Sequence, residues 1–141
     1  MPIIMLPAVK PAPAAAVLAA ILLLEGCGGG GSPDDLARER VSRTIADLED
    51  ALAGRDFGRI CDRIFSPEGR RRAGGEECRD RLARTSAGVR NPELELVSLR
   101  RVDGGAIARV RASSAGEQPA IDVIRLVPAG RGYRVESLSG Q

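Results

Sequence analysis

The hydrophobic and polar residues of this chain follow three different patterns, one after another. Residues 14–24 are all apolar, residues 33–87 carry apolar positions at helical spacing, and residues 93–138 are rich in Val, Ile and Leu with turn residues at short intervals. Helices grouped before strands are typical of an α+β domain in which the helices cover one face of a sheet. The pattern therefore predicts a short apolar leader followed by one small α+β domain.

The first predicted helix begins after Ser32. A serine at the N-cap, Pro33 at the first helical position and two aspartates near the positive end of the helix are all favourable there. Apolar residues then mark one face of the helix up to Gly54, which we expect to cap its end in the left-handed conformation. That face consists of Leu36, Val41, Ile45, Leu48 and Leu52.

Two shorter helices are predicted next. Asp56 can cap a second helix, whose apolar residues recur at positions i, i+3, i+4, i+7 and i+8. These residues are Phe57, Ile60, Cys61, Ile64 and Phe65. Ser66-Pro67 is expected to end this helix. A polar loop is expected to follow through Gly74-Gly75, and a third helix is expected to cover residues 76–87.

Four strands are predicted in the rest of the chain. Their expected bounds are residues 93–102, 106–113, 120–127 and 133–138. Short connections between successive strands favour an antiparallel meander. The expected fold is therefore three N-terminal helices packed on a curved, mostly antiparallel four-stranded sheet. Four side chains are expected in its core: Leu48, Ile64, Leu82 and Val123.

The beginning of the chain has the three parts of a secretory signal. Lys10 supplies the only early positive charge, the apolar run follows, and the small Gly26 precedes the expected cleavage point. The apolar run is much shorter than the roughly 20 residues that a membrane-spanning helix needs. Residues 1–26 are therefore expected to be a removable signal peptide, with either Met1 or Met5 as its start.

The stretch Leu24-Glu25-Gly26-Cys27 resembles a bacterial lipobox, with Glu25 at a position that usually holds a small or apolar residue. The resemblance implies that Cys27 receives a diacylglyceryl thioether and holds the mature protein on the extracytoplasmic face of the bacterial cell membrane. Two or more acyl chains anchor a protein stably, whereas one short chain binds only marginally. The alternatives are an ordinary cleaved signal with an incidental cysteine, and an uncleaved anchor.

Residues 28–31 are all glycine, which is typical of a flexible tether. Residues 27–33 are thus expected to connect the membrane to a folded domain of residues 34–141. Loss of the signal peptide removes Lys10 and Glu25 and leaves 20 arginines and 18 acidic residues, so the net charge stays at +2.

The charges and the cysteines exclude several kinds of function. A net charge of +2 does not suggest a nucleic-acid partner, and the basic run Arg70-Arg71-Arg72 is expected in a solvated loop. The chain has no histidine, and its three cysteines lack the close spacing of a zinc site, so no metal or other cofactor is expected. Nucleophilic catalysis is equally unsupported, because no histidine can activate a serine.

Two stretches of the chain are similar to one known superfamily. The segment IADLEDALAGRDFGRICDRIFSPEGRR resembles the opening of small actinobacterial lipoproteins of the nuclear transport factor two-like, or cystatin-like, superfamily, and IRLVPAGRGYRVESL resembles its last hairpin. The resemblance spans about residues 35–138 and implies a cone-shaped domain with a cavity between helices and sheet. The superfamily contains ketosteroid isomerase, scytalone dehydratase and limonene epoxide hydrolase as well as members without catalysis, so the fold does not decide the activity.

Lipidation of Cys27 would leave Cys61 and Cys78 as an even pair in an oxidising compartment. Both cysteines lie on the apolar faces of their predicted helices, so both are expected to point inward. We therefore predict a disulfide between them. It would close a loop that contains several glycines and a proline.

Three residues are candidates for a ligand-binding site. In the predicted strand that contains AIDVIRLV, Asp122 and Arg125 lie on opposite faces, and the pattern does not decide which face meets the cavity. Asp122 in the cavity would suit a base or a ligand anchor, whereas Arg125 would suit an acidic ligand. Tyr133 matches the packing aromatic residue at the start of the superfamily's final strand.

Two hypotheses about function follow from these residues. The leading one is a non-catalytic, lipid-anchored module that binds a small ligand or a neighbouring envelope protein. The competing one is a cavity enzyme of the isomerase or dehydratase type that uses Asp122. Such an enzyme needs a cavity of roughly 300 Å³ or more with a carboxylate on its wall.

Overall fold

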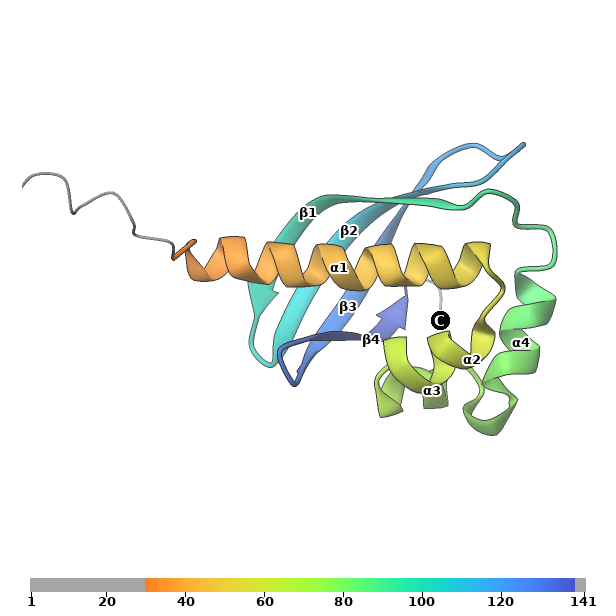
Figure 1. The fold of residues 1–141 in the computed structure, drawn as a ribbon, viewed down its shortest axis with the longest axis horizontal. Coiled ribbons are helices and arrows are strands. Elements are labelled where there is room, and N and C mark those ends of the chain that lie inside the picture. Colours follow the sequence, from red (N-terminus) through yellow and green to blue (C-terminus); the bar gives the residue numbers. More distant parts are fainter. Residues whose placement is uncertain (1–29, 139–141) are drawn as a thin grey trace, which may run out of the picture. The chain divides into compact units, whose positions relative to one another are not determined.

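The computed structural model describes residues 30–138, which form an α+β domain of one long helix, several short helices and one sheet (Figure 1). The signal peptide predicted for residues 1–26 and the lipidation predicted at Cys27 lie outside the described residues. The α-helices are α1 (Pro33–Ala53), α2 (Phe57–Arg59), α3 (Pro67–Arg72) and α4 (Cys78–Thr85). A π-helical turn covers Ile60–Ile64 and a 3₁₀ turn covers Gly75–Glu77. The strands are β1 (Glu93–Val102), β2 (Gly105–Ser113), β3 (Ala120–Ala129) and β4 (Gly132–Leu138).

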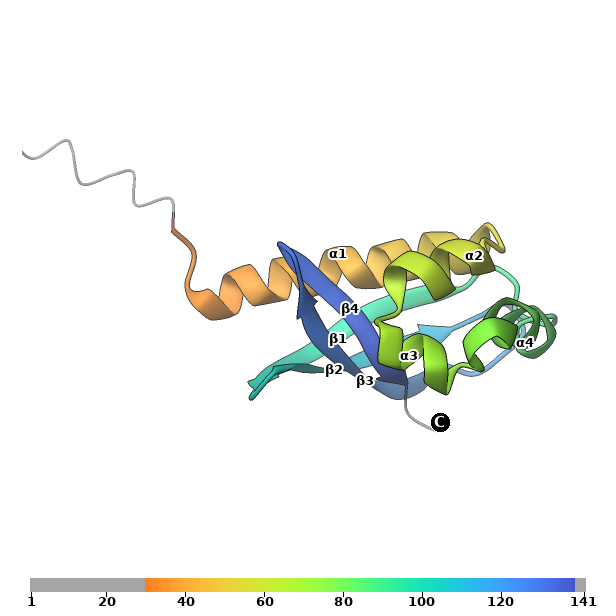
Figure 2. The same cartoon turned by 90° about the horizontal axis from the view of Figure 1, so that it is seen from below.

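The four strands form an antiparallel meander in the order β1-β2-β3-β4. Their bounds lie within two residues of the predicted ones. Helix α1 contacts both edge strands, β1 and β4, so the sheet curves around it (Figure 2). The predicted α+β class and the antiparallel meander are therefore confirmed.

The helices cover only one face of the sheet. This inner face carries the buried side chains of β2 and β3: Ala106, Ala108, Val110, Ile124 and Leu126. On the opposite, outer face, Ile121 and Val123 are each 42% exposed. The prediction that Val123 is buried was wrong, because β3 is apolar on both faces and helices cover only the other one. Leu48 and Ile64 are buried as predicted, and Leu82 is partly buried.

Helix α1 begins as its sequence predicts. The Ser32 hydroxyl accepts a hydrogen bond from the Asp35 N–H at 3.1 Å, and the Asp35 carboxylate accepts one from the Ser32 N–H at 3.2 Å. This reciprocal pair is a capping box, which satisfies backbone donors that have no partner inside the helix. The local signals around Ser32 are therefore sufficient to start the helix.

The end of α1 differs from the prediction. Gly54 has φ −80° and is not left-handed, whereas the next residue, Arg55, has φ 53°. The chain reverses one residue later than expected, and the Asp56 N–H donates to the Ala51 carbonyl at 2.8 Å to close the turn. The Arg55 guanidinium also donates to the Ala87 carbonyl at 3.2 Å, which ties this turn to the segment after α4.

The second predicted helix is present, but it changes from an α-helix to a π-helix after Arg59. Asp56 caps α2, since its carboxylate accepts the Arg59 N–H at 2.9 Å. The helix then widens into the π-helical turn, and Phe65 donates its N–H to the Ile60 carbonyl at 2.8 Å. Phe65 leaves the helix in an extended conformation and forms a β-bridge with Val135. The apolar stripe therefore still reaches the core, where Phe65 is buried.

A helix was missed where a loop was expected. Ser66-Pro67 ends the second helix, but the same pair begins α3, because the Ser66 hydroxyl accepts the Gly69 N–H at 3.0 Å and proline suits the first helical position. Gly69 packs directly on β4, where a Cβ atom would overlap the Val135 carbonyl oxygen. The region after α1 thus holds three short α-helices rather than the two predicted.

Substitutions of two isoleucines on β3 test which face of the sheet is covered. Ile124 is 3% exposed and Ile121 is 42% exposed, although they are the same residue type on the same strand. Ile124→Ala should lower the free energy of unfolding by about 2–5 kcal/mol, because it leaves a cavity in the core. Ile121→Ala should cost less than about 1 kcal/mol. Urea unfolding measures both, and equal losses would contradict the assignment of inner and outer faces.

Candidate functional site

A cavity of about 310 Å³ opens on the inner face of the sheet. Its walls come from the second half of α1, the segment between α4 and β1, and the neighbouring ends of β2 and β3. The apolar part of the wall includes Leu48, Leu52, Val89, Leu94, Val110 and Ile124. The polar part includes Ser86, Ser113, Ser114, Glu117, Gln118 and Asp122. A largely apolar wall with a few polar groups is typical of a small-molecule site.

Small side chains create the space for this cavity. Ala112 on β2 pairs with Ala120 on β3, and both line the cavity. Protein interiors are close-packed, so larger side chains at this pair of positions would fill the volume. Among the described residues, β4 pairs with β3 only from Ile124 toward the β3–β4 turn, so it does not extend over this end of the sheet.

Asp122 lies on the cavity wall. It is half-buried on the inner face, opposite Val110 on β2 and on the same side of β3 as Ile124. The structure thus decides between the two faces that the sequence left open. It places the carboxylate of Asp122, not the guanidinium of Arg125, on the cavity side.

Arg125 and Tyr133 lie elsewhere. Arg125 is on the outer face, where its Nε donates to Glu136 Oε2 at 2.7 Å in an ion pair. Tyr133 lines a separate groove beside α1, and its carbonyl accepts a hydrogen bond from the Thr44 hydroxyl at 3.0 Å. The three candidate residues therefore do not form one site, and only Asp122 reaches the cavity.

Glu117 and Gln118 were not recognised from the sequence. They lie in the connection between β2 and β3, and Glu117 accepts a hydrogen bond from the Ser114 hydroxyl at 2.9 Å. The Ala115 N–H in the same connection donates to the Arg90 carbonyl at 2.8 Å and so fastens this loop to the segment before β1. No local pattern predicts this contact, because its partners come close only in the folded domain.

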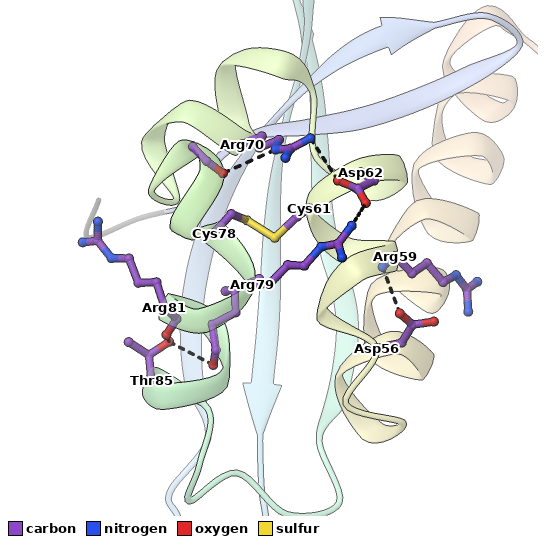
Figure 3. The surroundings of a disulfide bond; sticks show 11 residues. Asp56, Arg59, Cys61, Asp62, Arg70, Cys78, Arg79, Arg81 and Thr85 are labelled. Atoms are coloured by element: carbon purple, nitrogen blue, oxygen red, sulfur yellow. Dashed lines mark hydrogen bonds and ion pairs between the residues drawn. A yellow bond between two sulfur atoms is a disulfide. The ribbon is translucent and has the colours of Figure 1, made fainter.

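The predicted disulfide between Cys61 and Cys78 is present (Figure 3). Both cysteines are buried, and their Cα atoms are 6.2 Å apart. This separation lies within the usual range for a disulfide. The bond joins the π-helical turn to the start of α4, the helix that leads into the cavity wall.

An acidic side chain reinforces the same junction. The Asp62 carboxylate lies 3.0 Å from Arg70 Nη1 and also forms an ion pair with Arg79 (Figure 3). Asp62 comes from the π-helical turn, Arg70 from α3 and Arg79 from α4. The three short helical elements are thus joined by one disulfide and one shared carboxylate.

The basic run Arg70-Arg71-Arg72 lies in α3 and not in a loop. Arg71 and Arg72 both form ion pairs with Glu68. Their hydrogen bonds hold the pKa of the Glu68 carboxyl below its ordinary value, and the bond from Arg71 has the larger effect. Arg70 binds Asp62. All three guanidinium groups are therefore engaged in ion pairs within the domain, which makes this run an unsuitable anion site.

Metal sites and membrane spans are not found in the described part of the chain. No group of three acidic or cysteine side chains between residues 30 and 138 is close enough to hold a metal ion. None of the helices in this range is long and apolar enough to cross a membrane. No protein-family model matches the chain, and no curated protein is significantly similar to it.

Proposed function

We propose that this protein is a lipid-anchored, non-catalytic domain that binds a small ligand in the cavity beside Asp122. The observation that carries the proposal is a cavity of about 310 Å³ with a largely apolar wall and the Asp122 carboxylate on it. An apolar wall favours a ligand with an apolar body. Carboxylates at Asp122 and Glu117 favour a ligand that carries an amine or another hydrogen-bond donor.

The proposed anchor at Cys27 is supported by two features of the described residues. Helix α1 begins at Pro33, so five residues, 28–32, separate the cysteine from the helix, and this connection can span about 20 Å at most. The Cys61–Cys78 disulfide suits an oxidising compartment such as the extracytoplasmic side of a bacterial membrane. Attachment at Cys27 would therefore keep the start of α1 close to the membrane surface.

Membership of the nuclear transport factor two-like superfamily is part of this proposal. An antiparallel meander that curves around a long first helix, with a cavity on its inner face, supports it. The predicted cone shape is part of the same proposal. Helix α3 is additional to the three N-terminal helices that the apolar pattern predicts.

The competing hypothesis of a cavity enzyme has one observation in its favour. The cavity reaches the roughly 300 Å³ that such an enzyme needs, and Asp122 lines it. General acid–base catalysis usually pairs such a carboxylate with a second group, often a histidine or a tyrosine. The chain has no histidine, and its one tyrosine, Tyr133, lies in another groove. Binding is therefore the function that the geometry supports better.

Binding of two fluorescent probes tests the proposal. A dansyl group with a short alkylamine arm and the same group with a carboxylate arm differ only in charge. The amine probe should bind wild-type protein more tightly, and Asp122→Asn should weaken its binding about tenfold, because a charge-assisted hydrogen bond is lost. The carboxylate probe should bind Asp122→Asn at least as well as wild type. Fluorescence titration gives both dissociation constants.

Two further variants control this experiment. Asp103→Asn removes an exposed carboxylate in the β1–β2 turn and should leave binding of the amine probe unchanged. Ala112→Leu should fill the cavity and weaken both probes. Equal affinity of the amine probe for wild type, Asp122→Asn and Ala112→Leu would contradict the proposal. Chemical conversion of a bound compound that depends on Asp122 would favour the enzyme instead.

A further inference from the structure

A second groove gathers arginines from three separate parts of the chain. It has a volume of about 290 Å³ and lies between α1 and the β3–β4 turn, where the Thr44 hydroxyl binds the Tyr133 carbonyl. Both views of the fold show this turn beside the first half of α1 (Figures 1 and 2). The arginines that line it are Arg40, Arg43, Arg63, Arg131 and Arg134. We refer to these five residues and the space between them as the basic groove.

Most of the charge in the basic groove is not neutralised within the domain. Arg43 forms an ion pair with Glu39 at 3.0 Å, and Asp47, the acidic residue on the groove wall, pairs with Arg59 at 2.9 Å. The other four arginines form no ion pair with any residue in the range 30–138. Like charges held close together attract anions, and a groove concentrates this effect.

The surroundings of the basic groove include an exposed apolar side chain. Leu36, in the first turns of α1, is 43% exposed. It precedes Arg40 by four residues and Arg43 by seven, so all three lie on one face of the helix. Arg40 lies about 10 Å along the helix axis from Pro33, where the chain leaves the domain toward Cys27. Leu36 and Arg40 thus lie in the half of α1 that is nearer to the tether.

We propose that the basic groove docks the domain on anionic phospholipid headgroups of the membrane to which Cys27 holds it. The inference rests on the proposed anchor, because a tether of five residues, 28–32, keeps the start of α1 within about 20 Å of the headgroups. Guanidinium groups bind phosphate oxygens through paired hydrogen bonds. Leu36 would contact the interfacial region beside them.

Docking of this kind would fix the orientation of the domain. A lipid anchor alone leaves a domain free to rotate about its tether, whereas a tethered groove meets headgroups at a high effective concentration. Arginines at an anionic surface each strengthen attachment by about fivefold. The outer face of the sheet also carries arginines, Arg100 and Arg109, but they lie across the sheet from α1 and provide a matched control.

Arginine labelling on vesicles tests the inference. The full-length lipidated protein is reconstituted into vesicles of phosphatidylcholine alone or with phosphatidylglycerol, and phenylglyoxal modification is followed by mass spectrometry. Arg40 and Arg131 should react at least about fivefold more slowly on the anionic vesicles. High salt should remove this protection, because it screens charge. Arg40→Gln/Arg131→Gln should abolish the protection of Arg63, whereas Arg100→Gln/Arg109→Gln should not.

The outcomes separate the basic groove from the anchor. Equal labelling on neutral and anionic vesicles by protein that is bound to both would overturn docking and leave the anchor intact. Failure to attach to neutral vesicles would overturn the anchor, and protection on anionic vesicles alone would then still support the groove. If inorganic phosphate protects the groove arginines from phenylglyoxal as strongly as anionic vesicles do, the groove binds a soluble anion and the proposal is overturned. Protection of these arginines by RNA or by an acidic peptide, but not by anionic vesicles, would also overturn the proposal. Unchanged thermal unfolding of both double variants shows that they are folded.

Discussion

Replacing Cys27 by alanine should move the protein from the detergent phase to the aqueous phase of a two-phase extraction. The acyl chains proposed on this cysteine are the attachment to the membrane, and two or more chains hold a protein there stably. Without them, the described domain offers no helix that could cross a bilayer. Immunoblotting of the two phases measures the partition, and mass spectrometry of the N-terminal peptide detects the thioether.

Glu25→Ala provides the matched control for this experiment. It changes the neighbouring part of the lipobox-like stretch to a small residue and keeps Cys27, so the protein should stay in the detergent phase. If wild type and Cys27→Ala distribute equally between the phases, the lipid anchor is wrong. The cavity would then belong to a domain held at the membrane in some other way or not at all.

Loss of the Cys61–Cys78 disulfide should lower the free energy of unfolding by about 3 kcal/mol. The bond closes a loop with a sequence separation of 17, which restricts the unfolded chain. The elements that it joins are short: the π-helical turn has 5 residues and α4 has 8. Isolated helices of this length are unstable in water, so they depend on their connections to the rest of the domain. Small domains have a total stability of only about 5–15 kcal/mol.

Denaturant unfolding of Cys61→Ala/Cys78→Ala and of wild type with and without a reductant measures this effect. The reductant leaves the core composition unchanged, so it separates the covalent bond from the packing of the sulfur atoms. Asp62→Asn is the control in the same junction, because it breaks the ion pairs with Arg70 and Arg79 but keeps the bond. These pairs are partly exposed, so the control should cost about 1 kcal/mol or less. Two free thiols in denatured, non-reduced wild type would show that the bond does not form.

The release of the short helices should also affect the cavity. Ser86 and Val89 follow α4 directly and line the cavity wall. Reduced protein is therefore expected to bind the amine probe less tightly than oxidised protein. The disulfide thus contributes to the ligand site through position as well as through overall stability.

Local signals predicted much of the secondary structure. The capping box at Ser32, the cap at Asp56 and the bounds of the four strands all follow from residues within a few positions of each feature. Helix α3 was missed because Ser66-Pro67 both ends one helix and begins the next, and only the hydrogen bond to Gly69 shows the second role. The left-handed conformation expected at Gly54 falls one residue later, at Arg55, whose side chain also contacts the distant Ala87 carbonyl.

The sequence by itself determined that helices precede strands, that the strands form an antiparallel meander and that the two domain cysteines pair. Caps, turns and periodicity act over short distances, and few pairings of the cysteines were possible. Tertiary structure alone decided which face of β3 is covered. Ile121 and Val123 are as apolar as Ile124 and Leu126, and only the position of the helices separates them. It also brought Asp122 to the cavity and Arg40 to the β3–β4 turn. Such sites form between segments far apart in the chain, and their positions depend on how whole elements pack.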